Sequence, residues 1–236
     1  QLYDSIIRQE VPGHQASSVV SFMDVMRQGS VHQKFAVISL IARAFRPAFT
    51  PVLQQALKDE ANEIRVQAAT AIAKLTDENL KLMQSLEDKA KAKPGDVEAM
   101  ERLARAYDDF SYSGILEATH THTMRSRALD LWLKIAEADP DHPVAQMAVG
   151  RLLMRLERYE LAANWMERAI AEERASPQMV VWYMECLFQQ GRLDELRLFA
   201  KSRGDRIEEE RPISAKALSA VRLWRSAPSD AGFSHA

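Results

Sequence analysis

Apolar residues recur at every third or fourth position along nearly the whole chain, which is the spacing of helices that bury one face. Alanine, leucine, glutamate, arginine and methionine dominate the sequence, and all five favour helices. Only 8 glycines interrupt them, and runs of β-branched residues are short. The pattern therefore predicts an all-α fold made of consecutive helices.

A first internal repeat has a period of 31 residues. HQKFAVISLIAR (residues 32–43) matches EIRVQAATAIAK (residues 63–74), with Leu40 falling on Ala71. Pro47 and Pro51 mark the turn and the start of the second helix, because proline is tolerated in a helix's first turn. The segments that precede these two stretches match as well, with Phe22, Val25 and Met26 falling on Leu53, Ala56 and Leu57. Each unit is therefore predicted to be a short helix pair.

The segment PAFTPVLQQALKDEANEIRVQAATAI (residues 47–72) resembles HEAT repeats, because a leucine-rich helix, Asp59, a hydrophobic–arginine pair and small residues follow in that order. The resemblance implies that Asp59 and Arg65 form hydrogen bonds that hold successive units in register. The earlier unit keeps Lys34 at the position of Arg65 but has Gln28 in place of the aspartate. A partner-binding role for Arg65 is the alternative to this structural ladder.

A second repeat has a period of about 34 residues, the length of the tetratricopeptide motif that it resembles. Residues 143–176 form one full unit, in which the small residues Gly150, Ala162 and Ala169 let two helices approach closely. Another unit begins at Pro177, and an earlier one begins at Val97. The two kinds of repeat together predict a right-handed solenoid of helical hairpins.

The repeats also set the expected domain boundaries. KAKAKPGD (residues 89–96) breaks the first pattern, because Pro94 and Gly95 end a helix and Asp96 can cap the next one. We therefore expect HEAT-like repeats in residues 1–93 and tetratricopeptide repeats in residues 94–204. Residues 205–236 are expected to hold a capping helix and a flexible tail.

The segment DDFSYSGILEATHTHTMRSRALDLW (residues 108–132) is longer than the motif allows. Tyr107 and Ala128 are twenty-one positions apart where the motif has nine, so twelve residues are inserted. We expect the insertion to lengthen both helices, with the turn in residues 116–123. His120 and His122 could bind a metal or serve a ligand-sensing module, but a structural zinc site needs about four ligands. The preferred interpretation is an exposed helix turn without metal.

Tetratricopeptide arrays usually bind partners with the inner face of their first helices. The resemblance places that face at Val144, Met147, Arg151 and Met154 in one unit and at Gln178, Val181, Glu185 and Phe188 in the next. Several of these residues are apolar, so we expect something to cover them. The amphipathic segment PISAKALSAVRLW (residues 212–224) is the favoured cover, and a partner's helix or extended segment is the alternative.

The candidate partner-binding residues come from this inner face and from the insertion. The insertion supplies aromatic and aliphatic residues that either extend the apolar seam of the hairpin or form a partner patch. The full candidate set is Met147, Arg151, Met154, Val181, Glu185, Phe188, Tyr112 and Ile115.

Composition and motifs narrow the function classes. The net charge of −2 and the lack of a basic stripe disfavour a nucleic-acid partner. The single cysteine, Cys186, excludes an internal disulfide and is flanked by apolar residues, so we expect a core residue. No phosphate-binding loop, H-E-x-x-H, C-x-x-C or G-x-S-x-G motif occurs. We therefore expect a protein that is not an enzyme and needs no cofactor.

HEAT-like units followed by tetratricopeptide units, with LARAYDDFSYSGILE (residues 103–117) and ALKDEANEIRVQAATAI (residues 56–72), resemble the cytoplasmic part of the PelE family. The resemblance spans residues 20–202. It implies a scaffold for bacterial Pel exopolysaccharide synthesis, on the cytoplasmic side of the inner membrane. The implied partners are the cyclic-di-GMP receptor PelD, PelG and the glycosyltransferase PelF, with membrane segments preceding Gln1. A soluble tetratricopeptide adaptor or co-chaperone is the competing interpretation.

Overall fold

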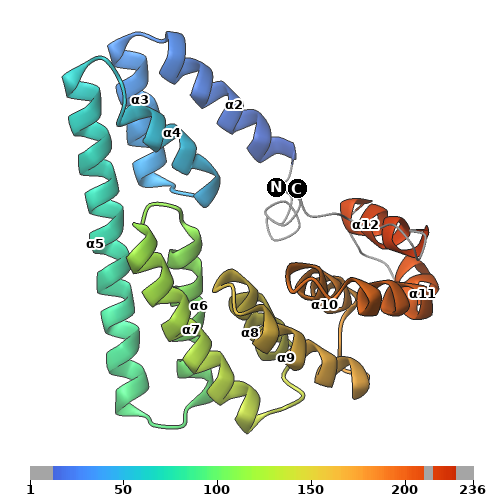
Figure 1. The fold of residues 1–236 in the computed structure, drawn as a ribbon. Helices are drawn as coiled ribbons and strands as arrows, with labels where there is room; N and C mark the ends of the chain where they lie inside the picture. The colour runs from blue at the N-terminus through green and yellow to red at the C-terminus, as the bar shows by residue number, and fades with distance from the viewer. Residues whose placement is uncertain (1–12, 210–214, 227–236) are drawn as a thin grey trace. The chain divides into compact units, whose positions relative to one another are not determined.

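The computed structural model describes residues 13–209 and 215–226, and all the regular structure in these ranges is helical (Figure 1). Consecutive helices pack against one another as hairpins. The predicted all-α fold class is therefore confirmed. The chain divides into two compact units between Leu131 and Trp132, and each is described by itself.

The N-terminal unit begins with two helix pairs that share one apolar core. Ile38, Leu53 and Ile64, from three different helices, are completely buried in this core. Ser30 starts the second helix with a capping box, in which its hydroxyl accepts from Gln33 N and its own N–H donates to the Gln33 side chain. The elements are α2 (Gly13–Gln28), α3 (Val31–Arg43), the 3₁₀ helix η1 (Pro47–Phe49), α4 (Thr50–Ala56), α5 (Asn62–Ala92), α6 (Val97–Tyr112) and α7 (Ala118–Ala138), in which the division between the units falls.

The predicted register of 31 residues is wrong in detail. Leu40 is exposed whereas its predicted counterpart Ala71 is buried, and Met26 is buried whereas Leu57 is exposed. Positions thirty residues apart agree instead, since both members of each of these pairs are buried: Met26 and Ala56, Ile38 and Ala68, Ile41 and Ala71. Apolar neighbours such as Ile38, Leu40 and Ile41 make both alignments plausible from residue type alone.

The predicted boundary after residue 93 is a turn between two helices. Gly95 has a φ of +87°, and Asp96 caps α6 by accepting a hydrogen bond from Ala99 N at 3.1 Å. The compact unit nevertheless continues through this turn to Leu131, because the 31-residue helix α5 packs against both α3 and α6. The predicted helix break is present, and the change from HEAT-like to tetratricopeptide repeats at this turn stays a prediction.

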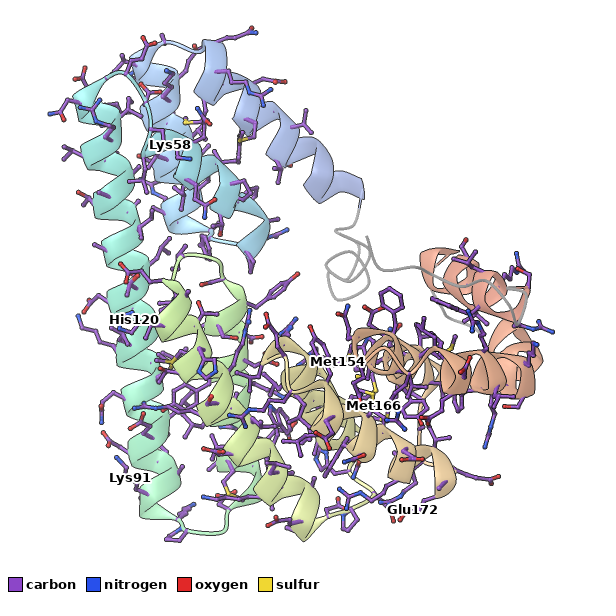
Figure 2. The ribbon with its side chains drawn as sticks, in the orientation of Figure 1. Lys58, Lys91, His120, Met154, Met166 and Glu172 are labelled. Atoms are coloured by element: carbon purple, nitrogen blue, oxygen red, sulfur yellow. The ribbon has the colours of Figure 1, made fainter. Side chains whose placement is uncertain are left out.

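The insertion lengthens both helices of its hairpin, as predicted. α6 has 16 residues and α7 has 21, whereas α8 has 13. The turn occupies residues 113–117 rather than the predicted 116–123, and Gly114 in this turn has a φ of +74°. His120 and His122 therefore lie in the first turns of α7, where both are exposed (His120 is labelled in Figure 2).

The C-terminal unit contains regular hairpins with a period of 34 residues. Both members of each pair at this spacing are buried: Val149 and Tyr183, Leu153 and Leu187, Ala162 and Leu196. This register is confirmed. The helices after α7 are α8 (Pro143–Arg155), α9 (Tyr159–Ala171), α10 (Pro177–Gln189), α11 (Leu193–Glu209) and α12 (Ala215–Ser226).

The C-terminal helix α12 packs against α11, in the place expected of a cap. Its Val221 is completely buried. The cap region was predicted to start at residue 205, but α11 continues to Glu209. Part of the predicted capping segment, residues 212–214, lies outside the described residues.

Candidate protein-binding surface

The first helices of the C-terminal unit, α8 and α10, start in the same way. Each has a proline in its first turn, which suits the fixed φ of that residue. The side chain of Ser176 caps α10 by accepting from Met179 N at 3.3 Å, and His142 Nδ1 accepts from Ala145 N at 3.2 Å. These two starts place Val144 and Gln178, thirty-four residues apart, at equivalent positions of the two helices.

Only some side chains of the predicted inner face are accessible to solvent. Phe188 is 47% exposed and Val144 is 37% exposed. Met154 is completely buried and Val181 is nearly so, and Met154 lies with Met166 in the interior of this unit in Figure 2. Two of the candidate partner-binding residues are therefore core residues in the free chain. Met147, Arg151, Gln178 and Glu185 are half-buried.

Two half-buried members of the inner face have hydrogen-bond partners within the unit. The Ser176 hydroxyl lies 2.9 Å from Met147 Sδ and donates to it. Glu185 Oε1 accepts from Gln189 Nε2 at 2.8 Å, one helical turn away. A contact from the start of α10 thus holds Met147, and a contact within α10 holds Glu185.

The ring of Phe188 meets α12. The ring centroids of Phe188 and Trp224 are 5.7 Å apart, with the planes inclined at 53°. Such a tilted geometry is favourable for aromatic pairs. The predicted internal cover therefore reaches the inner face at Phe188, although almost half of the phenylalanine stays accessible.

The two candidates in the insertion differ. Tyr112 is exposed, whereas Ile115 packs against the apolar core of the N-terminal unit. The turn between them is tied to α4, since Thr50 Oγ1 donates to the carbonyl of Ser113 at 2.5 Å and Gln54 Nε2 reaches the carbonyl of Gly114 at 3.5 Å. The insertion thus links the α6–α7 hairpin to α4, in the second helix pair of this unit.

Of the two predicted ladder residues, Asp59 contacts the preceding helix pair, whereas Arg65 forms hydrogen bonds within its own pair. Lys34 Nζ donates to Asp59 Oδ2 at 2.6 Å, and Arg65 donates to the carbonyls of Asp59 and Glu60 at 2.8 Å. Burial acts to raise the pKa of Asp59, but hydrogen bonds from Lys34 and the Ala61 N–H, with the charges of Lys34 and Arg65, lower it below its usual value. Lys34, rather than Arg65, supplies the link between repeats.

A polar cluster joins α5, α6 and α7, and it gave no signal in the sequence. Tyr107 donates its hydroxyl proton to Glu87, and Arg127 lies 3.3 Å from the Tyr107 hydroxyl. The hydrogen bond from Tyr107 lowers the pKa of Glu87, with the charge of Lys91 adding to the effect. Burial and Glu87 together raise the pKa of Tyr107. The members lie up to forty residues apart, so no local motif marks them.

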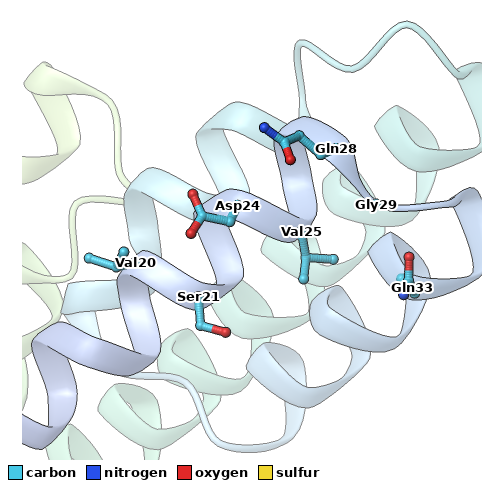
Figure 3. Close-up of a pocket in the computed structure, with 7 residues that line it drawn as sticks. All are labelled: Val20, Ser21, Asp24, Val25, Gln28, Gly29 and Gln33. Carbon is cyan, nitrogen blue, oxygen red and sulfur yellow. The ribbon is translucent and has the colours of Figure 1, made fainter.

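The remaining candidates for chemistry give no site. Burial, with the charge of Glu185, raises the pKa of the Cys186 thiol to about 12. Among the described residues no three His, Cys, Asp or Glu side chains gather as a metal site would need. A surface hollow at the turn from α2 to α3 is lined by Val20, Ser21, Asp24, Val25, Gln28, Gly29 and Gln33 (Figure 3). Gln33 already serves the cap of α3 there.

Comparison with known proteins assigns this chain to no family. Across the described ranges, no helix is long and apolar enough to cross a membrane. No family model matches the chain, and no curated protein matches it. A solved structure of MamA AMB-1 is similar over 85% of this chain and 94% of that chain, with 16% sequence identity and a TM-score of 0.43. At this level of similarity, the fold assignment depends on the chain's own helices and their register.

Proposed function

We propose that this chain is a non-catalytic scaffold that binds a protein segment along the inner face of α8 and α10. The observation that carries the proposal is Phe188, a large apolar side chain left 47% exposed at an inner-face position. Val144, in the first turn of α8, is also exposed. Accessible apolar side chains on a concave helical surface are typical anchors for a partner's helix or extended segment.

The titratable groups support a non-catalytic role. The shifted pKa values of Asp59 and Glu87 come from pairs that join neighbouring helices, as described above. The only thiol, Cys186, is buried and strongly disfavoured as a thiolate at neutral pH. Perturbed groups at an active site would instead converge on a common cleft.

The specific assembly that we propose is the Pel exopolysaccharide synthase of bacteria. The support is the order of the repeats, HEAT-like and then tetratricopeptide-like, and the PelE-like segments at residues 56–72 and 103–117. In this proposal the chain lies at the cytoplasmic side of the inner membrane, attached by a membrane segment elsewhere in the parent protein. Its partners are PelD, PelG and the glycosyltransferase PelF.

Site-specific photo-crosslinking tests this function. p-Benzoylphenylalanine replaces Phe188 in the tagged parent protein, which is irradiated in native membranes before mass spectrometry. Crosslinks from this position to a glycosyltransferase or to a cyclic-di-GMP receptor are expected. The matched control carries the same amino acid at Leu161, which is 54% exposed on the second helix α9. Equal crosslinking from both positions, or crosslinks only to general chaperones, would contradict the Pel assignment.

A further inference from the structure

We propose that α12 is a displaceable, autoinhibitory occupant of the inner face, and that a partner must remove Trp224 from Phe188 to bind. The partner chemistry that fits is an amphipathic helix presenting an aromatic side chain in the place of Trp224. This inference rests on the proposed function, since it concerns the same face. It adds a mechanism that controls access to the site.

The contact between the two rings is of the kind that a competing ligand can replace. Phe188 lies one helical turn beyond Glu185 on the inner face, and the Trp224 centroid is 5.7 Å from its own. Phe188 remains 47% exposed beneath this contact, and Trp224 itself is only half-buried. An incoming ring can therefore begin to contact Phe188 before Trp224 has left.

The described side chains of α12 are less buried than those of α10, the helix whose Phe188 Trp224 contacts. Among its described side chains only Val221 is buried, and Leu223 is 63% exposed. In α10, by contrast, the buried residues are Met179, Val181, Trp182, Tyr183, Met184, Cys186 and Leu187. A segment with few buried apolar contacts opens locally at a lower free energy than the whole domain. α12 can thus detach while α8 to α11 stay folded.

The short connection to α11 makes α12 an effective competitor. Only five residues separate the end of α11 at Glu209 from the start of α12 at Ala215. A ligand tethered this closely has an effective concentration on the order of millimolar. A partner's apparent affinity is therefore reduced by the fraction of molecules in which α12 is attached. Weakening the attachment should expose the site without altering it.

The experiment titrates the full chain with a synthetic peptide of residues 212–226 and follows the amide NMR signals up to millimolar peptide. In wild-type protein the chain's own α12 occupies the site, so weak binding is expected. Trp224→Ala should bind the peptide about tenfold more tightly, because its own helix competes less. The shifts should centre on residues 185–189 of α10. Leu223→Ala, which changes an exposed residue of the same helix, should behave like the wild type.

Two further results decide the inference. Adding Phe188→Ala to Trp224→Ala should abolish the gain in peptide affinity, with an unchanged thermal melt showing that the fold persists. Hydrogen exchange of the wild type should show α12 opening before α8 to α11. Equal peptide affinity of wild type and Trp224→Ala, no binding by either, or a double variant that binds as well as Trp224→Ala would each overturn the proposal. The peptide titration uses no partner protein. Its result therefore does not depend on whether the crosslinking experiment identifies a partner.

Discussion

A Cβ atom on Gly150 would lie 3.0 Å from Met166 Cε, so α8 and α9 meet where glycine leaves room for the methionine. Thirty-four residues later, the equivalent positions hold Met184 and Ala200, both buried. The large and the small residue have thus exchanged places between successive hairpins. This exchange keeps the volume at the contact roughly constant, which close-packed interiors require.

The exchange predicts strong coupling between the two positions. Gly150→Met alone should overpack the contact and cost about 1–3 kcal/mol of unfolding free energy. Met166→Ala alone should leave a cavity and cost about 2–5 kcal/mol. The double variant reproduces the arrangement of the α10–α11 contact. It should therefore lose clearly less unfolding free energy than the two single variants lose together. Urea denaturation of the four proteins measures the coupling, and strictly additive costs would contradict the volume argument.

Glu157 follows the C-cap of α8 and has a φ of +59°, in the left-handed region that favours glycine. The equivalent residue after α10 is Gly191, with a φ of +71°. Glu157→Gly should therefore stabilise the chain by about 0.5–1 kcal/mol, because relief of the strained backbone exceeds the gain in unfolded-state entropy. Thermal and urea unfolding measure the change. Glu167→Gly, at an exposed position in the middle of α9, is the control and should instead destabilise by about 1 kcal/mol. A stabilising control would argue against the backbone explanation.

Thr50 and Ser113 show what the insertion does. Thr50→Val removes the hydroxyl that donates to the Ser113 carbonyl and leaves that buried acceptor unpaired. We expect a loss of about 1–3 kcal/mol and faster hydrogen exchange in residues 113–117. Thr70→Val is the matched control, because Thr70 Oγ1 donates within α5 on an exposed face and its loss should cost less than about 0.5 kcal/mol. Equal effects of the two variants would show that the insertion is not held through Thr50.

These contacts show how far the sequence could be interpreted. The 34-residue register was predictable because small residues at Gly150 and Ala162 mark close helix contacts. The N-terminal register was misplaced by one residue, because Ile38, Leu40 and Ile41 are all apolar and only their burial separates the alignments. The link from Thr50 to Ser113 ends on a backbone carbonyl sixty-three residues away, and no side-chain pattern reveals such an acceptor. At the candidate surface, residue type identified Phe188 but could not show that Met154 is buried.

The ion pair of Lys34 and Asp59 predicts a dependence of stability on pH. The pKa of Asp59 is lowered in the folded chain, so its ionised form stabilises the fold above the unfolded value of about 3.9. This contribution is lost as pH falls through the folded pKa. Asp59→Asn should cost about 1.5–3 kcal/mol at pH 7 and progressively less below about pH 4. Urea unfolding across pH measures the difference.

The control for that experiment is Asp77→Asn. Asp77 pairs with Lys81 at 2.7 Å on the exposed face of α5, where both side chains are more than half accessible. Water and salt screen such a pair, so its loss should change stability by less than about 1 kcal/mol at any pH. A pH-independent cost for Asp59→Asn, or an equal cost for Asp77→Asn, would contradict the proposed role of the buried pair.

Cys186 should be almost inert in the folded chain. Its side chain is completely buried, and its pKa of about 12 leaves very little thiolate at pH 8. Because it is the chain's one cysteine, a chromogenic disulfide reagent reports on it alone. We expect reaction in native buffer to be at least about a thousandfold slower than in urea, since the thiol must first be exposed by opening of α10. Leu161→Cys in a Cys186→Ser background places the thiol at an exposed site and should react rapidly while folded. Rapid reaction of native Cys186 would mean that α10 opens easily. That result would contradict the proposal that α12 detaches while α10 stays folded.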